Sequence, residues 1–123
     1  MHFFRYRKFI NQHLIGQMSS NRCDTVIQQR GITETNSNMC KGRNTFILAS
    51  TNVVTPICGR AGTPHGDMTR STTPFHIIVC TLKNQGARRP HCQYRGQAHT
   101  AYVIIKCEQG HPVHFDGDIM YVN

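Results

Sequence analysis

Cys40-Lys41-Gly42-Arg43-Asn44-Thr45-Phe46 is the stretch that says most about the fold and chemistry of this chain. Two other pieces complete it: Gln12-His13 near the N-terminus, and Pro-Val-His-Phe-Asp at residues 112–116 near the C-terminus. Two histidines and a lysine are the side chains that cleavage of an RNA phosphodiester requires. One imidazole takes a proton from the 2′-hydroxyl, a second gives one to the leaving 5′-oxygen, and an ammonium group stabilises the charge between them. The pattern indicates His13, His114 and Lys41 as candidate catalytic residues.

The six cysteines suggest how a chain this small can be stable. With 123 residues, 38% hydrophobic residues and no Trp, the chain can build only a modest core. An even number of cysteines in a short chain predicts three disulfides and an oxidising compartment, although spacing alone leaves the pairing open. Zinc binding is the alternative, but the cysteines are widely spaced and no Cys-x-x-Cys pair occurs, so we expect no metal site.

The charge is strongly unbalanced. Lys and Arg number 14 against 6 Asp and Glu, which gives a net charge of +8 with the histidines neutral. This excess favours a polyanionic partner: RNA, a heparin-like glycan or an anionic membrane surface. Solubility of a secreted protein is the simpler alternative. No apolar run reaches the length of a membrane span, and no signal peptide is visible, so we expect a mature chain whose Met1 stems from expression.

The spacing of apolar residues predicts three short helices. Side chains at i, i+3, i+4, i+7 and i+8 form one helical face, made of Tyr6, Phe9, Ile10, His13 and Leu14. His13 should therefore face the interior. A second short helix fits residues 23–30, because a glycine follows and ends it. A third follows Ser50 for a turn or two only, since Pro56 cannot continue it.

The rest of the chain alternates between apolar and polar residues as strands do. Breaks are expected near residues 84–86, Gly96 and Gly110, and the predicted strands cover 43–48, 74–82, 92–95, 98–107 and 112–121. Helices come first and antiparallel strands follow, so the class is α+β. No repeat or linker divides the chain, and we expect a single domain of residues 1–123.

The Cys-Lys-x-x-Asn-Thr-Phe pattern of residues 40–46, together with His13 and His114, resembles the pancreatic-type ribonuclease superfamily. With six cysteines the chain is most similar to the angiogenin-like branch, and the resemblance extends from Lys8 to about Tyr121. It implies three short helices, a curved antiparallel sheet with the active site in its cleft, and an enzyme without a cofactor. It also implies three disulfides, Cys23–Cys80, Cys40–Cys92 and Cys58–Cys107.

The resemblance gives each candidate catalytic residue a role. His13 would be the general base and His114 the general acid, oriented by the carboxylate of Asp116 two residues along the same strand face. Lys41 would contact the phosphoryl group, and a disulfide at Cys40 would anchor its backbone. Each has an ordinary alternative: a satisfied core histidine, a strand histidine beside a surface aspartate, and a solvated lysine.

Four neighbouring residues match substrate-binding positions of the family. Thr45 would read a pyrimidine base through its backbone N–H and hydroxyl, and Phe115 would pack beside that base. A strand threonine and a core aromatic are the ordinary alternatives. Gln12 and Asn44 would support the site through hydrogen bonds.

The outer positions match the family less fully. Lys8 falls where the family contacts a remote phosphate and Glu108 near the downstream base pocket, although exposed charges are usually only solvated. Gly117 stands where the angiogenin branch has a glutamine that obstructs the pyrimidine pocket. We therefore expect that obstruction to be absent, unless Asp118 introduces another. Residues 60–67 stand where the family has a cell-binding loop, with an ordinary surface turn as the equal alternative.

Three functions follow as hypotheses. The first is a secreted, monomeric endoribonuclease that cuts RNA after pyrimidines to a 2′,3′-cyclic phosphate. The second is a cationic host-defence protein that acts on bacterial envelopes through Arg88, Arg89 and other arginines, independently of RNA cleavage. The third is an angiogenin-like signalling ligand with a cell-surface receptor. Residues 28–31 keep only one arginine, which puts nuclear targeting through that segment in doubt.

Overall fold

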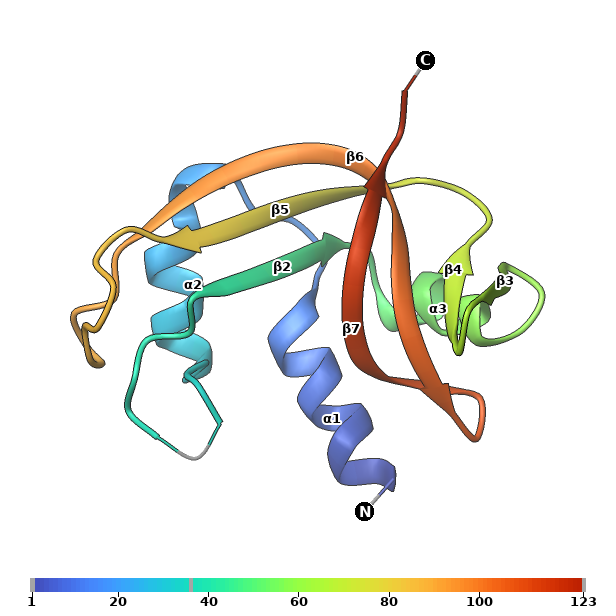
Figure 1. The fold of residues 1–123 in the computed structure, drawn as a ribbon, viewed down its shortest axis with the longest axis horizontal. Coiled ribbons are helices and arrows are strands. Elements are labelled where there is room, and N and C mark those ends of the chain that lie inside the picture. The colour runs from blue at the N-terminus through green and yellow to red at the C-terminus, as the bar shows by residue number, and fades with distance from the viewer. Residues whose placement is uncertain (1, 36, 123) are drawn as a thin grey trace.

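The structure is a computed structural model that describes residues 2–35 and 37–122 (Figure 1). Met1, and with it the expectation about its origin, lies outside these residues. The described residues form three α-helices and seven strands, in the order α1 (His2–His13), β1 (Leu14–Ile15), α2 (Cys23–Arg30), β2 (Arg43–Leu48), α3 (Thr51–Val54), β3 (Gly62–His65), β4 (Met68–Ser71), β5 (Phe75–Leu82), β6 (Tyr94–Glu108) and β7 (His111–Met120). Short 3-10 turns lie at Ser20–Arg22 and Thr55–Cys58.

A glycine and a proline mark the ends of α2 and α3. Gly31 ends α2 with a φ of 65°, a left-handed conformation that glycine adopts without a Cβ clash. The N–H groups of Gly31 and Ile32 then bond to carbonyls of the last turn of α2, at 3.1 Å each. α3 ends at Val54 and passes into a 3-10 turn that begins at Thr55, just before Pro56, so the helix is as short as the sequence predicts. In the described part of the chain, no helix has the length and apolar character needed to cross a membrane.

One curved sheet organises the molecule. Its strands lie in the order β1-β2-β5-β6-β4-β3, and β7 pairs with β6. All pairs are antiparallel except the short β1–β2 pair, which is parallel. The first half of β6 pairs with β5 and its second half with β7 and β4, so this strand arches across the whole molecule (Figure 1). α1 lies beside β2 and β7, on the concave side of the arch.

Two apolar clusters and three disulfides hold the helices to the sheet. One cluster packs Phe9 of α1 against buried residues such as Ile47 and Val103. The other packs Ile27 of α2 against Phe46 and its neighbours. The disulfides join Cys23–Cys80, Cys40–Cys92 and Cys58–Cys107, and each closes a loop worth about 4 kcal/mol in the chain-entropy model. The predicted α+β class, short helices and disulfide pairing are confirmed.

Three predicted boundaries needed correction. Leu14 lies in β1 rather than on the first helix, and residues 92 and 93, predicted as strand, precede β6. The predicted break at Gly96 is wrong, because β6 continues through it as one strand from Tyr94 to Glu108. The backbone of Gly96 packs closely against Ser20, because a Cβ added at Gly96 would lie only 1.9 Å from the carbonyl oxygen of Ser20. Gly96 thus lets the turn before α2 approach the sheet without interrupting it. Residues 60–67 lie mostly in the hairpin of β3 and β4, which turns at Gly66.

Candidate active site

A cleft of about 850 Å³ lies between α1, β2 and β7. All the candidate residues except Glu108 line it: Lys8, Gln12, His13, Lys41, Asn44, Thr45, His114, Phe115 and Asp116. They come from three segments that are far apart in the sequence, and the curvature of the sheet brings these segments together. Two imidazoles, an ammonium group and an aromatic ring therefore meet in one cleft.

His13 is held in a defined protonation form at the end of α1. Its side chain is buried beside Phe9 and stacks on Phe115, with 5.1 Å between ring centroids. Its Nδ1 lies 2.8 Å from the carbonyl oxygen of Thr45. Because a carbonyl only accepts, Nδ1 must carry the proton, and Nε2 of the neutral ring is left as the basic nitrogen.

Burial keeps that imidazole neutral. The pKa of His13 is lowered from 6.5 to about 3: desolvation is the largest cause, the nearby Lys41 and His114 add to it, and the bond to Thr45 opposes it. A neutral ring with a free Nε2 can accept a proton, so the site presents a base even in acidic solution. An anionic phosphate bound between these cationic groups would raise the pKa of His13 again.

The ammonium group of Lys41 is tethered within the cleft. Its Nζ donates to Asn44 Oδ1 at 2.9 Å and to Gln12 Oε1 at 3.4 Å. The amide of Asn44 in turn donates to the backbone oxygen of Gln12 at 2.8 Å, which links β2 to α1. Burial lowers the pKa of Lys41, Glu34 raises it, and Lys8 lowers it again. The two amides thus hold a partly desolvated cation in the cleft that His13 also lines.

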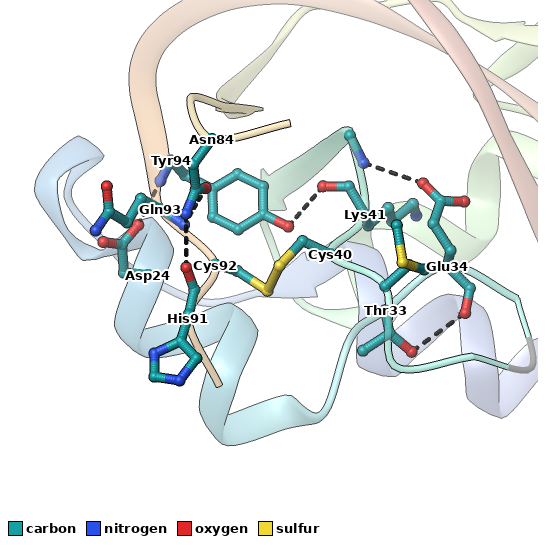
Figure 2. Close-up of a disulfide and its surroundings, with 12 residues drawn as sticks. Asp24, Thr33, Glu34, Cys40, Lys41, Asn84, His91, Cys92, Gln93 and Tyr94 are labelled. Carbon is teal, nitrogen blue, oxygen red and sulfur yellow. Dashed lines mark hydrogen bonds between the residues drawn. A yellow bond between two sulfur atoms is a disulfide. The ribbon is translucent and has the colours of Figure 1, made fainter. Parts of the chain in front are cut away.

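The backbone around Lys41 is also fixed (Figure 2). Cys40 is bonded to Cys92, and the phenol of Tyr94 donates to the carbonyl oxygen of Lys41 at 2.6 Å. Burial, with smaller effects of Glu34 and Asp24, raises the pKa of Tyr94 to about 12, so the phenol stays protonated as a donor. Neither anchor depends on the flexible part of the lysine side chain.

His114 and Asp116 lie beside two irregularities in the pairing of β6 with β7. The register shifts between Ile104 and Ile105 and again between Lys106 and Cys107, so Asp116 has no partner in the ladder. Such bulges reorient side chains and are common near active sites. His114 Nε2 lies 3.9 Å from Asp116 Oδ1, an ion-pair distance that is too long for a hydrogen bond. Both side chains are about half exposed.

The far wall of the cleft contains Gly117 and Asp118. A Cβ added at Gly117 would meet no atom within 4 Å, so this wall is open where a larger side chain could project. The carboxylate of Asp118 lies 3.7 Å from the guanidinium of Arg43, which offsets its charge.

Glu108 is the one candidate outside the cleft. Its carboxylate accepts a hydrogen bond from Arg5 at 2.6 Å. The sequence analysis missed Arg5 and Phe4, which line the cleft one turn before Lys8 on the same helix face. The i, i+4 spacing of Phe4 and the i, i+3 spacing of Arg5 from Lys8 were the available signal. It also missed Tyr94 and Glu34 as partners of the Lys41 segment, and no local motif marks either of them.

Among residues 2–35 and 37–122, no three His, Cys, Asp or Glu side chains come together in a way that could hold a metal ion.

The chain is similar in sequence and in structure to known proteins. A family model described as pancreatic ribonuclease matches residues 4–116. Ribonuclease-like 3 of Danio rerio is 37% identical over 120 residues, covering 94% of this chain and 80% of that protein. Angiogenin-4 of Mus musculus is 38% identical over 116 residues, covering 91% and 77%. The X-ray structure of zebrafish RNase5 superposes with a TM-score of 0.91 at 43% identity, covering 94% of each chain.

Proposed function

Because the chain belongs to the pancreatic ribonuclease family, in its six-cysteine angiogenin-like branch, and is a pancreatic-type endoribonuclease, we propose that it cleaves RNA after pyrimidines through His13, His114 and Lys41. The observation that carries the proposal is the bond from His13 Nδ1 to the carbonyl of Thr45. It leaves Nε2 as the base, in a cleft that also holds a second imidazole and an ammonium group.

In the proposed reaction, His13 Nε2 takes the proton of the ribose 2′-hydroxyl as its oxygen attacks phosphorus. His114, protonated at the outset, gives its proton to the 5′-oxygen as the bond from phosphorus to that oxygen breaks. The products are a 2′,3′-cyclic phosphate and a free 5′-hydroxyl. His13 ends protonated and His114 neutral, and proton exchange with solvent restores the starting state.

Lys41 would stabilise the phosphorane between these two steps. Its ammonium adds a charge-assisted bond to a non-bridging oxygen, and this bond strengthens as negative charge accumulates there. Asn44 and Gln12 hold the ammonium before substrate arrives, so little reorganisation is needed during the reaction. Lys8, exposed on the cleft edge, supports a contact with a neighbouring phosphate.

Pyrimidine preference would come from Thr45, whose N–H and hydroxyl suit the O2 and N3 atoms of the base. Phe115 would pack against the same base. Its ring stacks on His13, so a base seated there also lies close to the general base. Asp116 would orient His114 once its carboxylate moves from 3.9 Å into hydrogen-bond distance in the substrate complex.

The test is cleavage of a fluorogenic dinucleotide by the wild-type protein and by His13→Ala, Lys41→Ala and His114→Ala. Each variant should lose several orders of magnitude in kcat/KM while keeping its melting temperature to within a few degrees.

Wild-type activity should be unaffected by EDTA. The pH profile should be bell-shaped, because one imidazole must be neutral and the other protonated. Its acid limb should lie below pH 6.5, since burial lowers the pKa of His13. Full activity of His114→Ala would refute the assignment.

A second function, action on bacterial envelopes, is supported by the net charge of +8. Three disulfides support a secreted protein, since they form in oxidising compartments. We propose that the protein is a monomer and that RNA is its substrate. Heparin-like glycans, bacterial surfaces or a cell-surface receptor are the further partners that we propose. Bacterial killing by His13→Ala at the wild-type level would assign that activity to charge rather than to catalysis.

A further inference from the structure

We propose that Glu34 is a positioning residue for Lys41 and that it acts through the peptide unit that joins Lys41 to Gly42. This inference rests on the proposed role of Lys41 in cleavage. Glu34 belongs to the loop between α2 and β2, and it lies outside the residues that line the cleft. Its side chain reaches the backbone immediately after Lys41.

Both edges of this one peptide plane are held by side chains. On one edge, the carbonyl oxygen of Lys41 accepts the phenol proton of Tyr94 at 2.6 Å. On the other, the N–H of Gly42 donates to Glu34 Oε1 at 3.0 Å. Figure 2 shows the two contacts reaching the Lys41 segment from opposite sides, with the Cys40–Cys92 bond nearby. Because a peptide unit is rigid and planar, rotating it would break both bonds together.

The loop holds Glu34 in the position that this contact requires. Its N–H donates to the carbonyl of Met39 at 3.0 Å, and its own carbonyl accepts from Ser37 N–H and Thr33 Oγ1, each at 3.2 Å. Gly42 is tied to the sheet as well, since its carbonyl accepts from Leu82 N–H at 2.9 Å. The carboxylate therefore adds a side-chain contact at Gly42 to the backbone contact that Glu34 already makes with Met39.

The orientation of this peptide unit determines where the Lys41 ammonium group lies relative to the reacting phosphate. The Lys41 side chain begins at the Cα that precedes the pinned plane, and its far end bonds to Asn44. A change in the plane would move the start of the side chain while the far end is held, and small misplacements of a catalytic group reduce rates substantially. The charge of Glu34 acts in the same direction, because it favours the protonated form of the partly buried ammonium.

The test compares Glu34→Ala, which removes the acceptor, with Glu34→Gln, which keeps an acceptor oxygen and removes the charge. Asp67→Asn is the matched control: it is exposed in the turn between β3 and β4 and loses the same charge far from Lys41 along the chain. We expect Glu34→Ala to lower kcat for a dinucleotide about fivefold, since Glu34 is solvent exposed and one hydrogen bond is lost. KM should change little, and Glu34→Gln and Asp67→Asn should keep most of the wild-type kcat.

Hydrogen exchange of the Gly42 amide gives a readout that does not depend on activity. It should be slow in the wild-type protein and in Glu34→Gln, and about fivefold or more faster in Glu34→Ala. An unprotected Gly42 amide in the wild-type protein would overturn the proposal even if Glu34→Ala failed to fold. So would equal kcat of Glu34→Ala and wild type, or a Glu34→Gln variant as slow as Glu34→Ala. If instead Lys41→Ala kept full activity, the proposed function would fail and the peptide contact could still stand.

Discussion

The imidazole of His13 is buried between aromatic rings and yet must exchange protons during the proposed reaction. Its contact with Thr45 resolves this conflict in part, because it satisfies one nitrogen and fixes the tautomer. Burial of His13 also affects the free energy of unfolding. A histidine that is neutral when folded and protonated when unfolded makes folding depend on pH.

We expect this dependence to be measurable. The folded-state pKa of His13 is lowered to about 3 from 6.5, so below pH 6.5 the unfolded chain binds more protons and stability falls as the pH falls. Between pH 7 and pH 4, His13 should account for a loss of about 3 kcal/mol. Urea unfolding at both pH values should show a smaller loss for His13→Asn than for the wild-type protein. His114→Asn, which replaces an exposed histidine, is the control and should behave as the wild type.

A substitution at Gly117 can test how open the proposed base pocket is. No atom lies within 4 Å of a Cβ built there, so Gly117→Gln should fold normally and project its amide into the cleft. We expect kcat/KM for a dinucleotide to fall about tenfold, because the amide competes with the base for the polar groups of Thr45. Gly16→Gln is the control, since Gly16 is exposed, equally uncrowded and outside the cleft. Unchanged cleavage by Gly117→Gln would mean that this wall does not face the base.

At the scale of helices and strands, Arg30 connects α2 to the end of α1. Its guanidinium donates to the backbone carbonyls of Asn11 at 2.9 Å and Leu14 at 2.6 Å, and it lies 5.9 Å from the ring of Phe46. The only arginine of residues 28–31 is therefore engaged within the fold. This use of Arg30 supports the doubt about nuclear targeting through that segment.

Arg30→Ala should lower the free energy of unfolding by about 2 kcal/mol, because two carbonyls at the end of α1 lose their donor. A loss of this size corresponds to roughly 8 °C in melting temperature for a domain of this length. Arg22→Ala removes an exposed arginine from the preceding turn and should change the melting temperature by less than about 1 °C. Equal melting temperatures for the two variants would show that Arg30 is not a structural link.

The elements differ in how far the sequence predicts them. α2 and β2 have the predicted bounds. A following glycine marks the end of α2 locally, whereas β2 buries four consecutive residues and does not show the alternation on which its prediction relied. β1, β3 and β4 were missed, since strands of two to four residues show no usable period. The catalytic candidates were found by local motifs, whereas Tyr94 and Glu34 reach Lys41 only through folding. Contacts set by tertiary structure leave no signal in the nearby sequence.

For the whole molecule, the positive charge and the cleft are partly separate features. Arg88 and Arg89 lie outside the cleft-lining residues, although their backbone pairs with the segment before Lys41. Arg89 N–H donates to Asn38 O at 2.9 Å, and Met39 and Arg88 form a β-bridge. These are backbone contacts, so replacing the two side chains should leave the anchoring of Lys41 intact.

Arg88→Ala/Arg89→Ala should therefore weaken binding to heparin or anionic vesicles while dinucleotide cleavage stays within about twofold of wild type. The wild-type affinity should itself fall steeply with salt, because clustered cations release condensed counterions from a polyanion. Arg22→Ala/Arg95→Ala removes the same two charges from another exposed region, and it separates a local patch from net charge. A larger loss of heparin affinity in the Arg88/Arg89 double variant would indicate a local patch, and equal losses in the two double variants would indicate bulk charge.

Lys41→Ala should show the reverse pattern, with cleavage reduced by orders of magnitude and heparin affinity nearly unchanged. If the double variant at 88 and 89 lost cleavage as severely as Lys41→Ala, these arginines would belong to the active site.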